Sequence, residues 1–279
     1  MHRHAKFDLA RRMTSLAVLL THVFQVFWRR FFTIDDPYRY AASTIARHSV
    51  LIFFLLSGYL IALSIFGNRE RHSRFDVAEY ATTRAARIWP PLLGSVFVVL
   101  ICYALITYLH LPGGSTPYGV AGDQSVAREV FTVSYAEIIS SLLLLGGLGT
   151  ANAPLWSLYF EAWLYVAAAL LALAFFSGSM IFRIASSVSA AIFFVILVSI
   201  KHTFLFYTFV WFIGAGSCIA VHKGTKNMPK VALGVAILAF VGLCVVSPTS
   251  LLVPIRESPK AFLAQGIFAV IYAYVLFFW

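Results

Sequence analysis

Long apolar stretches recur along the whole chain and constrain its fold more than any other feature. A run of roughly 18 apolar residues is long enough to cross the ~30 Å hydrocarbon core of a bilayer as a helix. We count about nine segments, at residues 11–30, 48–66, 91–109, 136–149, 155–175, 182–200, 204–221, 231–247 and 262–279. We therefore predict an all-α fold, a polytopic bundle of transmembrane helices.

Composition agrees with a membrane-embedded chain. Hydrophobic residues make up 61% of the sequence, whereas soluble globular proteins average ~45–50%. The net charge of +10 would suggest nucleic acid in a soluble chain. Here Lys and Arg gather in loops and tails, as they do in membrane proteins whose cytoplasmic segments face anionic lipids. We expect the lipid bilayer, and no nucleic acid, as a partner.

The three cysteines indicate neither a metal site nor a disulfide. Cys102, Cys218 and Cys244 each lie within an apolar run and lack the close spacing of a metal site. Buried free thiols are usually small core residues, so we expect no disulfide and no metal. The basic stretch Met1–Arg12 resembles the start of a signal peptide, but no small-residue cleavage site follows. We expect a retained first span.

Basic loops predict the orientation. The amino-terminal tail and the 67–90 loop fall on one side of the membrane if the first two segments both span, and both are rich in Arg. Because cytoplasmic loops carry an excess of Lys and Arg, we expect a cytoplasmic N-terminus. The short segment 136–149 either spans or is re-entrant, and this choice decides on which side the three lysines of 222–230 fall.

The first segment carries a polar seam. We expect Asp8 to cap a helix that nothing breaks before Pro37. Eleven residues separate Arg11 from His22, which places them ~20° past three full turns and ~16 Å apart along the axis. The two side chains therefore share a face. The same stripe also holds Ser15, Gln25 and Arg29.

Ionisable side chains at membrane depth are costly and are functional by default. The imidazole of His22 can take and return a proton near neutral pH. The guanidinium of Arg11, at the membrane edge, can hold a phosphate through two parallel hydrogen bonds. The alternative for His22 is a hydrogen-bonded packing residue.

We expect a short surface helix within the loop at 67–90. Ser73 and Asp76 resemble a capping box at its start. The helix would run through Ile88, and the prolines at 90–91 would end it.

Two arginines of this predicted helix, Arg84 and Arg87, lie at i and i+3 and so on one face. The functional interpretation is a site for a phosphate-rich donor at the inner edge of the membrane. The alternative is an ordinary positive-inside element that faces the membrane surface.

A third polar signature follows Pro154, where a helix is expected to begin. Ser157, Glu161 and Tyr165 recur at i, i+4 and i+8 and form a second polar stripe. A carboxylate within a span needs a partner. A purely structural pairing of Glu161 with an Arg or a His is the alternative to a role in chemistry.

The segment 53–60 places the small residues Ser57 and Gly58 inside an apolar helix. Small residues let helices approach closely. Packing alone explains this segment, so its chemical meaning is weak by itself.

In this combination and order, the polar signatures resemble the membrane-bound acyltransferase 3 family, the O-acyltransferases that decorate bacterial surface glycans. The matching motifs cover residues 11–165, and the second half of the chain is similar to the family in hydropathy. The motifs are Arg-x10-His at Arg11 and His22, the segment 53–60, Arg-x-x-Arg-Ile-x-Pro from Arg84 to Pro90, and Trp-Ser-Leu-x-x-Glu-x-x-x-Tyr from Trp156 to Tyr165. One departure is Tyr59, which stands where phenylalanine is usual.

The resemblance implies a single transmembrane acyltransferase domain over residues 1–279. Family members typically have ten spans, so we expect about nine to ten transmembrane helices, with a missing last helix after Trp279 as one alternative. The implied activity moves an acyl group, most commonly acetyl, to a hydroxyl of a cell-surface or lipid-linked carbohydrate. The donor is cytoplasmic acyl-CoA, a co-substrate rather than a bound cofactor, and the implied location is the bacterial inner membrane.

The resemblance also assigns roles to the polar residues. Arg11, Arg84 and Arg87 would bind the phosphates of the acyl donor. His22 would act as general base toward the sugar hydroxyl or carry the acyl group transiently. Glu161 would orient the imidazole or stabilise its cationic form. The supporting side chains would be Ser57, Ser157 and Tyr165.

Two other classes of function fit the same residues. Intramembrane His, Glu and Arg also mark the proton relays and substrate paths of a transporter or flippase. Inverted repeats would favour that class, and the two halves of the sequence show no such symmetry. A non-catalytic assembly subunit is the remaining alternative.

Overall fold

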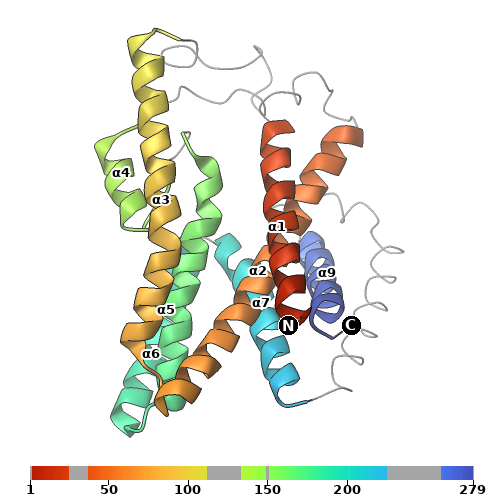
Figure 1. Ribbon diagram of the computed structural model, residues 1–279, viewed down its shortest axis with the longest axis vertical. Helices are drawn as coiled ribbons and strands as arrows, with labels where there is room; N and C mark the ends of the chain where they lie inside the picture. The colour runs from red at the N-terminus through yellow and green to blue at the C-terminus, as the bar shows by residue number, and fades with distance from the viewer. Residues whose placement is uncertain are drawn as a thin grey trace. The chain divides into compact units, whose positions relative to one another are not determined.

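The computed structural model describes residues 2–24, 37–111, 133–148, 151–200, 202–224 and 259–278 (Figure 1). Every regular element within these ranges is a helix, so the all-α prediction is confirmed. The elements are α1 (His2–Val23), α2 (Pro37–His72), α3 (Val77–Tyr108), α4 (Tyr135–Leu142), η3 (Ala153–Leu155), α5 (Trp156–Phe176), α6 (Met180–Ile200), α7 (His202–His222) and α9 (Pro259–Phe277).

Several of these helices suit a bilayer. In the described ranges, five helices are long and apolar enough to cross a membrane, namely α2, α3, α5, α6 and α7. Large apolar side chains such as Phe97 on α3 and Ile181 on α6 are exposed, as expected of helices that face lipid. The chain thus fits an integral membrane protein. The expected count of nine to ten spans is not confirmed, and segment 231–247 lies outside the described residues.

Several helices extend beyond their predicted ends. The first helix begins at His2, so Asp8 lies inside it and does not cap it. The predicted 67–90 loop shrinks to residues 73–76, because α2 continues to His72 and α3 begins at Val77. Basic and polar residues such as those at 67–72 are compatible with a helix that leaves the membrane and continues in water.

The start and the end of the predicted surface helix are also corrected. Asp76 alone is the N-cap, since its Oδ1 accepts a hydrogen bond from the backbone N–H of Glu79 at 3.0 Å. Ser73 lies in the connection with a φ of 57°. Pro90 and Pro91 do not end the helix, which continues to Tyr108. A proline removes one backbone hydrogen bond, but in lipid every other backbone group is still best satisfied by continuing the helix.

The segment predicted at 136–149 is not a straight span. Its helix, α4, has 8 residues, about 12 Å at 1.5 Å per residue, and turns follow it up to Leu148. Ser134 and Glu137 form a capping box that starts the helix. The short helix fits the re-entrant alternative.

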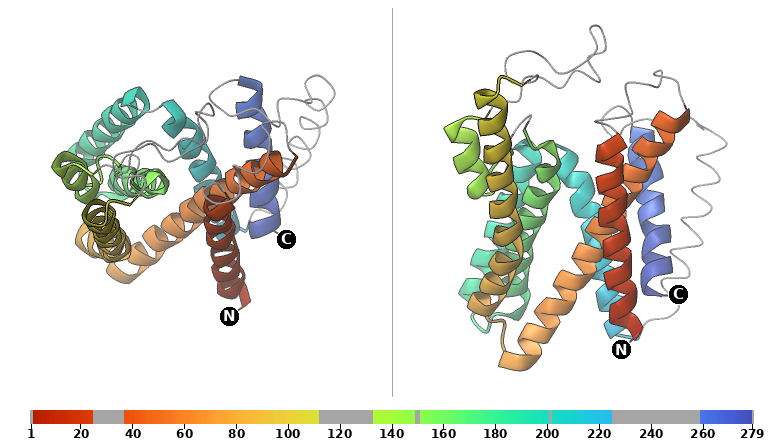
Figure 2. Two further views of the ribbon diagram at one scale, coloured as in Figure 1. Left: turned by 90° about the horizontal axis from the view of Figure 1, so that it is seen from above. Right: turned by 45° about the horizontal axis from the view of Figure 1, so that its top comes forward.

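The chain divides into two compact units, unit 1 (residues 1–74 and 171–279) and unit 2 (residues 75–170). In unit 1, α2 packs most extensively against α7 and α1, and α9 packs against α7 and α2 (Figure 1). Figure 2 shows α1, α2 and α9 side by side from two further directions.

Two glycines bring the backbones of α2 and α7 together. A Cβ atom on Gly58 would lie 2.0 Å from the carbonyl oxygen of Trp211, and one on Gly214 would lie 2.1 Å from the carbonyl oxygen of Leu55. Both distances are far too short for a carbon atom to fit. The helices can therefore cross this closely only because both positions lack a side chain, as the sequence predicted for Gly58.

Aromatic contacts fix the direction of the helices in unit 1. Phe66, near the end of α2, stacks on His222 at the end of α7 with ring centroids 5.1 Å apart. It also contacts Phe176, at the end of α5, at 6.5 Å. The C-terminal ends of α2, α5 and α7 thus meet. Lys223, directly after α7, therefore lies at the same end of unit 1 as the basic last turn of α2, and the other two lysines of 222–230 lie outside the described residues.

Unit 2 holds α3, α4 and the first part of α5. Its core contains Leu92, Val96 and Tyr159, all buried. The side chain of Asn152 donates a hydrogen bond to Ser95 at 2.7 Å, so the beginning of α5 lies beside the second half of α3. The two helices accordingly run in opposite directions.

Two hydrogen bonds hold the α4 segment against α5. The hydroxyl groups of Ser141 and Tyr159 are 3.0 Å apart. The indole Nε1 of Trp163 donates to the carbonyl oxygen of Leu144 at 2.8 Å. These contacts fix the start of α5 and, with it, the polar residues that follow.

Candidate functional site

A cluster of polar side chains joins α3 to α5 within unit 2. Nη2 of Arg87 lies 3.8 Å from Oε1 of Glu161. The hydroxyl of Tyr165 donates a hydrogen bond to the same carboxylate oxygen. The Glu161 side chain is 5% exposed and that of Arg87 is 32% exposed, so the carboxylate is enclosed while the guanidinium keeps access to the surroundings.

Arg84 lies between two aromatic rings of the same cluster. Its guanidinium carbon is 5.5 Å from the ring centroid of Tyr80 and 5.4 Å from that of Tyr165. Cation–π attraction operates within about 6 Å. The hydroxyl of Tyr80 donates to the backbone carbonyl of Tyr165 at 3.2 Å. Both arginines of the predicted donor site are therefore held by residues of α5.

Helical spacing explains how the sequence builds this cluster. Tyr80, Arg84 and Arg87 lie at i, i+4 and i+7 on α3, within ~60° of one another. Glu161 and Tyr165 lie one turn apart on α5, where i and i+4 side chains are neighbours. Since α3 and α5 run in opposite directions, the two stripes can meet along their length.

The charges of the cluster do not balance. The five residues carry two guanidinium groups and one carboxylate, which gives the cluster one net positive charge. A buried carboxylate is tolerated only when it is paired and hydrogen-bonded, and Arg87 and Tyr165 meet that need. The excess positive charge and the partial exposure of Arg87 suit an anionic group such as a phosphate.

The polar seam of α1 is only partly enclosed. Arg11 and His22 are both half-buried, whereas Ser15 is exposed. Gln25 and Arg29 lie outside the described residues.

The face that α1 buries runs beside this seam. Its buried positions Phe7, Thr14 and Thr21 recur every seven residues, and α1 packs on α2. The Nδ1 atom of His22 is buried. The imidazole of His22 therefore lies at the edge of the interface between α1 and the rest of unit 1.

The supporting residues differ in their surroundings. Ser57 is buried in α2. Ser157 donates its hydroxyl to the carbonyl oxygen of Pro154 at 3.3 Å, a local contact at the start of α5. Tyr165 is a full member of the Arg84 and Arg87 cluster.

The predicted site residues are divided between the two units. Arg11, His22 and Ser57 belong to unit 1, whereas Arg84, Arg87, Ser157, Glu161 and Tyr165 belong to unit 2. The structural pairing of Glu161 with an arginine, which sequence left as an alternative, is present with Arg87. The action of Glu161 on His22 stays a prediction.

Sequence reasoning missed two polar contacts. Tyr80 belongs to the arginine cluster, and its spacing of four residues from Arg84 was a signal that could have found it. In unit 1, Nδ1 of His48 lies 3.0 Å from the hydroxyl of Tyr272. The position of His48 at the start of an apolar run was a signal for the histidine, but no signal in the sequence pointed to Tyr272. Among the described residues, no group of three or more His, Cys, Asp or Glu side chains could hold a metal ion.

Comparison with known proteins bears on this arrangement. The sequence model of the acyltransferase 3 family, described as an acyltransferase domain, matches residues 4–279. The chain belongs to the acyltransferase 3 family. It therefore carries an acyltransferase domain, the type found in enzymes that transfer acyl groups.

A curated relative agrees with this membership of the acyltransferase 3 family. The chain is 27% identical, over 172 residues, to an O-acetyl transferase of Shigella phage Sf6. The aligned part covers 60% of this chain and 45% of the phage protein, so the chain spans less than half the length of that relative. No solved structure matches the chain.

Proposed function

We propose that the chain is a membrane-bound O-acyltransferase that moves an acyl group, most simply acetyl, from acyl-CoA to a carbohydrate hydroxyl. The observation that carries the proposal is the match of the acyltransferase 3 family over residues 4–279. The name of the phage relative, an O-acetyl transferase, supports an oxygen acceptor and an acetyl donor. The five membrane-competent helices support action at a bilayer, for which we propose the bacterial inner membrane.

The donor would bind through arginines. Coenzyme A carries several phosphates, and guanidinium groups hold phosphates through paired charge-assisted hydrogen bonds. Arg84 and Arg87 supply the excess positive charge of their cluster, and Arg87 is still 32% exposed beside Glu161. Arg11, half-buried on α1, would contribute a further contact to the donor.

His22 would carry the chemistry. In the simplest sequence, its imidazole removes the proton of the acceptor hydroxyl while the oxygen attacks the thioester carbonyl carbon. A C–O bond forms, the C–S bond breaks, and the leaving thiolate takes up the proton held by the imidazole. The partial burial of His22 supports this role, because a partly enclosed site limits competing hydrolysis by bulk water. Transient acylation of His22 is the variant of the same step.

Two roles are open to Glu161, and both are testable. It positions Arg87 through the ion pair, and it would stabilise the cationic imidazole of His22, as predicted from sequence. The contacts of the described residues support the first role. If Glu161 acts through Arg87, its replacement raises KM for the donor; if it acts on His22, kcat falls at saturating donor.

The basic ends of the helices support the orientation we propose. Arg69 and Arg71 lie in the last turn of α2, and the stacking of Phe66 on His222 joins that end of unit 1 to the end of α7 and Lys223. Phe7 of α1 contacts Tyr59 of α2 at 5.0 Å, toward the same end. By the excess of basic residues on the inner side, we assign this end and the N-terminus to the cytoplasm.

The experiment that tests the proposal measures transfer directly. The full chain is reconstituted in liposomes with radiolabelled acetyl-CoA and a panel of mono- and oligosaccharide acceptors. The proposal expects label in a sugar ester that mild alkali releases. Label in no acceptor and not in the protein, from folded chain with donors of several acyl lengths, would contradict it.

A further inference from the structure

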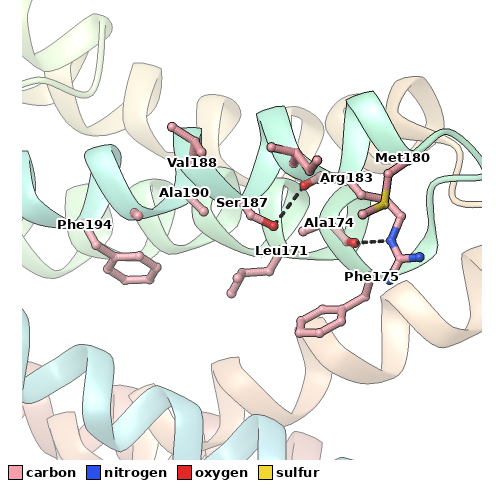
Figure 3. A pocket seen from close by; sticks show the side chains of 11 residues that line it. Leu171, Ala174, Phe175, Met180, Arg183, Ser187, Val188, Ala190 and Phe194 are labelled. Carbon is pink, nitrogen blue, oxygen red and sulfur yellow. Dashed lines mark hydrogen bonds between the residues drawn. The ribbon is translucent and has the colours of Figure 1, made fainter.

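An apolar groove in unit 1 runs along α6. It has a volume of about 590 Å³, within the ~300–1,000 Å³ range of ligand pockets. Both of its walls belong to unit 1, namely the last turns of α5 from Leu171 and the first four turns of α6. Figure 3 shows Leu171, Phe175 and Phe194 at the groove, with Met180 and Arg183 at one end.

The groove is long enough to hold a lipid chain. Its lining extends along α6 from Met180 to Phe194, about 21 Å at 1.5 Å per residue. One leaflet of a bilayer takes up about half of the ~30 Å hydrocarbon core. Almost all of the lining is apolar, and Phe175 is 70% exposed. A hydrocarbon chain lying along α6 would cover this surface.

One cation stands at the end of this apolar surface. Nε of Arg183 donates a hydrogen bond to the carbonyl oxygen of Ala174 at 3.1 Å, which ties the guanidinium to the end of α5 (Figure 3). That bond uses one of the five N–H donors of the side chain. Arg183 is exposed, and among the described residues no carboxylate pairs with it.

A second guanidinium lies at the same end. The guanidinium carbon of Arg69 is 4.5 Å from the ring centroid of Phe176, the neighbour of the groove residue Phe175. Arg69 and Arg183 therefore both contact the last residues of α5, and Arg183 is the one that lines the groove. A guanidinium in the wall of an apolar groove, with a second one at the same helix end, complements a ligand with an anionic head and a hydrocarbon tail. Basic pockets between transmembrane helices have this chemistry toward anionic lipids.

We propose that this groove binds one anionic phospholipid of the bilayer, with its phosphate at Arg183 and an acyl chain along α6. The site is separate from the acyl-transfer proposal and does not depend on it. A phosphate binds a guanidinium through paired charge-assisted hydrogen bonds. Because the surrounding lipid tails are equally apolar, an acyl chain prefers the groove to the rest of the bilayer only if it packs closely against the groove walls. Both the charge and the groove are therefore required.

Lipid retention by the purified full chain tests this directly. Native mass spectrometry in detergent compares dioleoyl phosphatidylglycerol with dioleoyl phosphatidylcholine, which have the same chains and differ in net charge. The expected result is preferential retention of the anionic lipid by the wild type. Arg183→Gln should reduce that retention by about fivefold, the effect of one basic residue near an anionic surface.

A second variant tests the groove itself. Ala191 lines it, and Ala191→Trp fills it without changing charge, so retention of the anionic lipid should fall there too. The matched control is Arg12→Gln, an exposed arginine on α1, which should retain the lipid as the wild type does. Melting temperatures within a few degrees of the wild type establish that each variant folds.

Three results would overturn the proposal. Equal retention of the two lipids by the wild type would remove the role of the net negative charge of the headgroup, whether or not Arg183→Gln folds. If retention of the anionic lipid fell with Arg183→Gln but not with Ala191→Trp, the lipid would bind through surface charge and not in the groove. If retention fell with Ala191→Trp alone, the groove would bind the acyl chain without recognition of the phosphate by Arg183.

Discussion

Arg87 of α3 and Glu161 of α5 form an ion pair at 3.8 Å, and the two residues come from helices that run in opposite directions. The pair predicts an energetic coupling between the helices. Because Arg87 is about a third exposed, we expect a coupling of about 1 kcal/mol rather than the larger values of fully buried pairs.

A double-mutant cycle with Arg87→Gln, Glu161→Gln and the combined variant measures this coupling from unfolding in detergent. Tyr165→Phe removes the second partner of the carboxylate and should lower the free energy of unfolding by about 1 kcal/mol. Additive effects of the two charge substitutions, within ~0.3 kcal/mol, would show that the ion pair does not couple α3 to α5.

Gly58 and Gly214 should tolerate no side chain. A methyl group at either position would overlap a carbonyl oxygen of the facing helix, so the helices would have to separate. We expect Gly58→Ala and Gly214→Ala each to lower the free energy of unfolding by about 2 kcal/mol or more.

Gly216 provides the matched control, since it lies on the same helix and a methyl group placed there would have no neighbour within 4 Å. Alanine favours a helix interior over glycine by ~0.5–1 kcal/mol, so Gly216→Ala should be neutral or slightly stabilising. Equal losses at Gly214 and Gly216 would contradict the close crossing of α2 and α7.

Trp163 should hold the α4 segment in place. Trp163→Phe keeps an aromatic ring and removes the N–H that donates to Leu144. We expect a loss of about 1–2 kcal/mol and faster hydrogen exchange in residues 143–148. Trp89, exposed on α3, gives the control: Trp89→Phe should change neither quantity. Unchanged exchange in Trp163→Phe would mean that this hydrogen bond does not fix the segment.

The sequence predicted the helical architecture and the polar stripes of α3 and α5, because apolar runs and i, i+4 spacing are local signals. Arg84 and Arg87 on one face, and Glu161 with Tyr165 on another, follow from periodicity alone. Their meeting does not, since it depends on the antiparallel packing of α3 and α5. For the same reason Tyr80 was missed, although it lies one turn from Arg84.

Helix ends were predicted less well than helix cores. The prolines at 90–91 are strong helix breakers in water, where freed backbone groups can bind solvent. In an apolar surrounding the cost of leaving many such groups unsatisfied exceeds the cost of two prolines, so α3 continues to Tyr108. Local rules could not weigh these two costs.

If Arg84 binds the donor, its replacement should weaken binding rather than slow the chemistry. We expect Arg84→Gln to raise KM for acetyl-CoA by about tenfold, the value of one charge-assisted hydrogen bond, with kcat little changed. Arg74→Gln, an exposed arginine between α2 and α3, is the control and should leave KM unchanged. A fall in kcat at constant KM would contradict donor binding by Arg84.

The most direct test of the proposed function is acyl transfer by His22→Ala. Wild type, His22→Ala and the control His72→Ala, an exposed histidine at the end of α2, are compared in liposomes with radiolabelled acetyl-CoA and the best acceptor. Loss of a positioned general base typically costs ~10²–10⁴-fold in rate. We predict such a loss in His22→Ala, with unchanged melting temperature, and none in His72→Ala. Transfer at the wild-type rate by folded His22→Ala would contradict the catalytic role of His22.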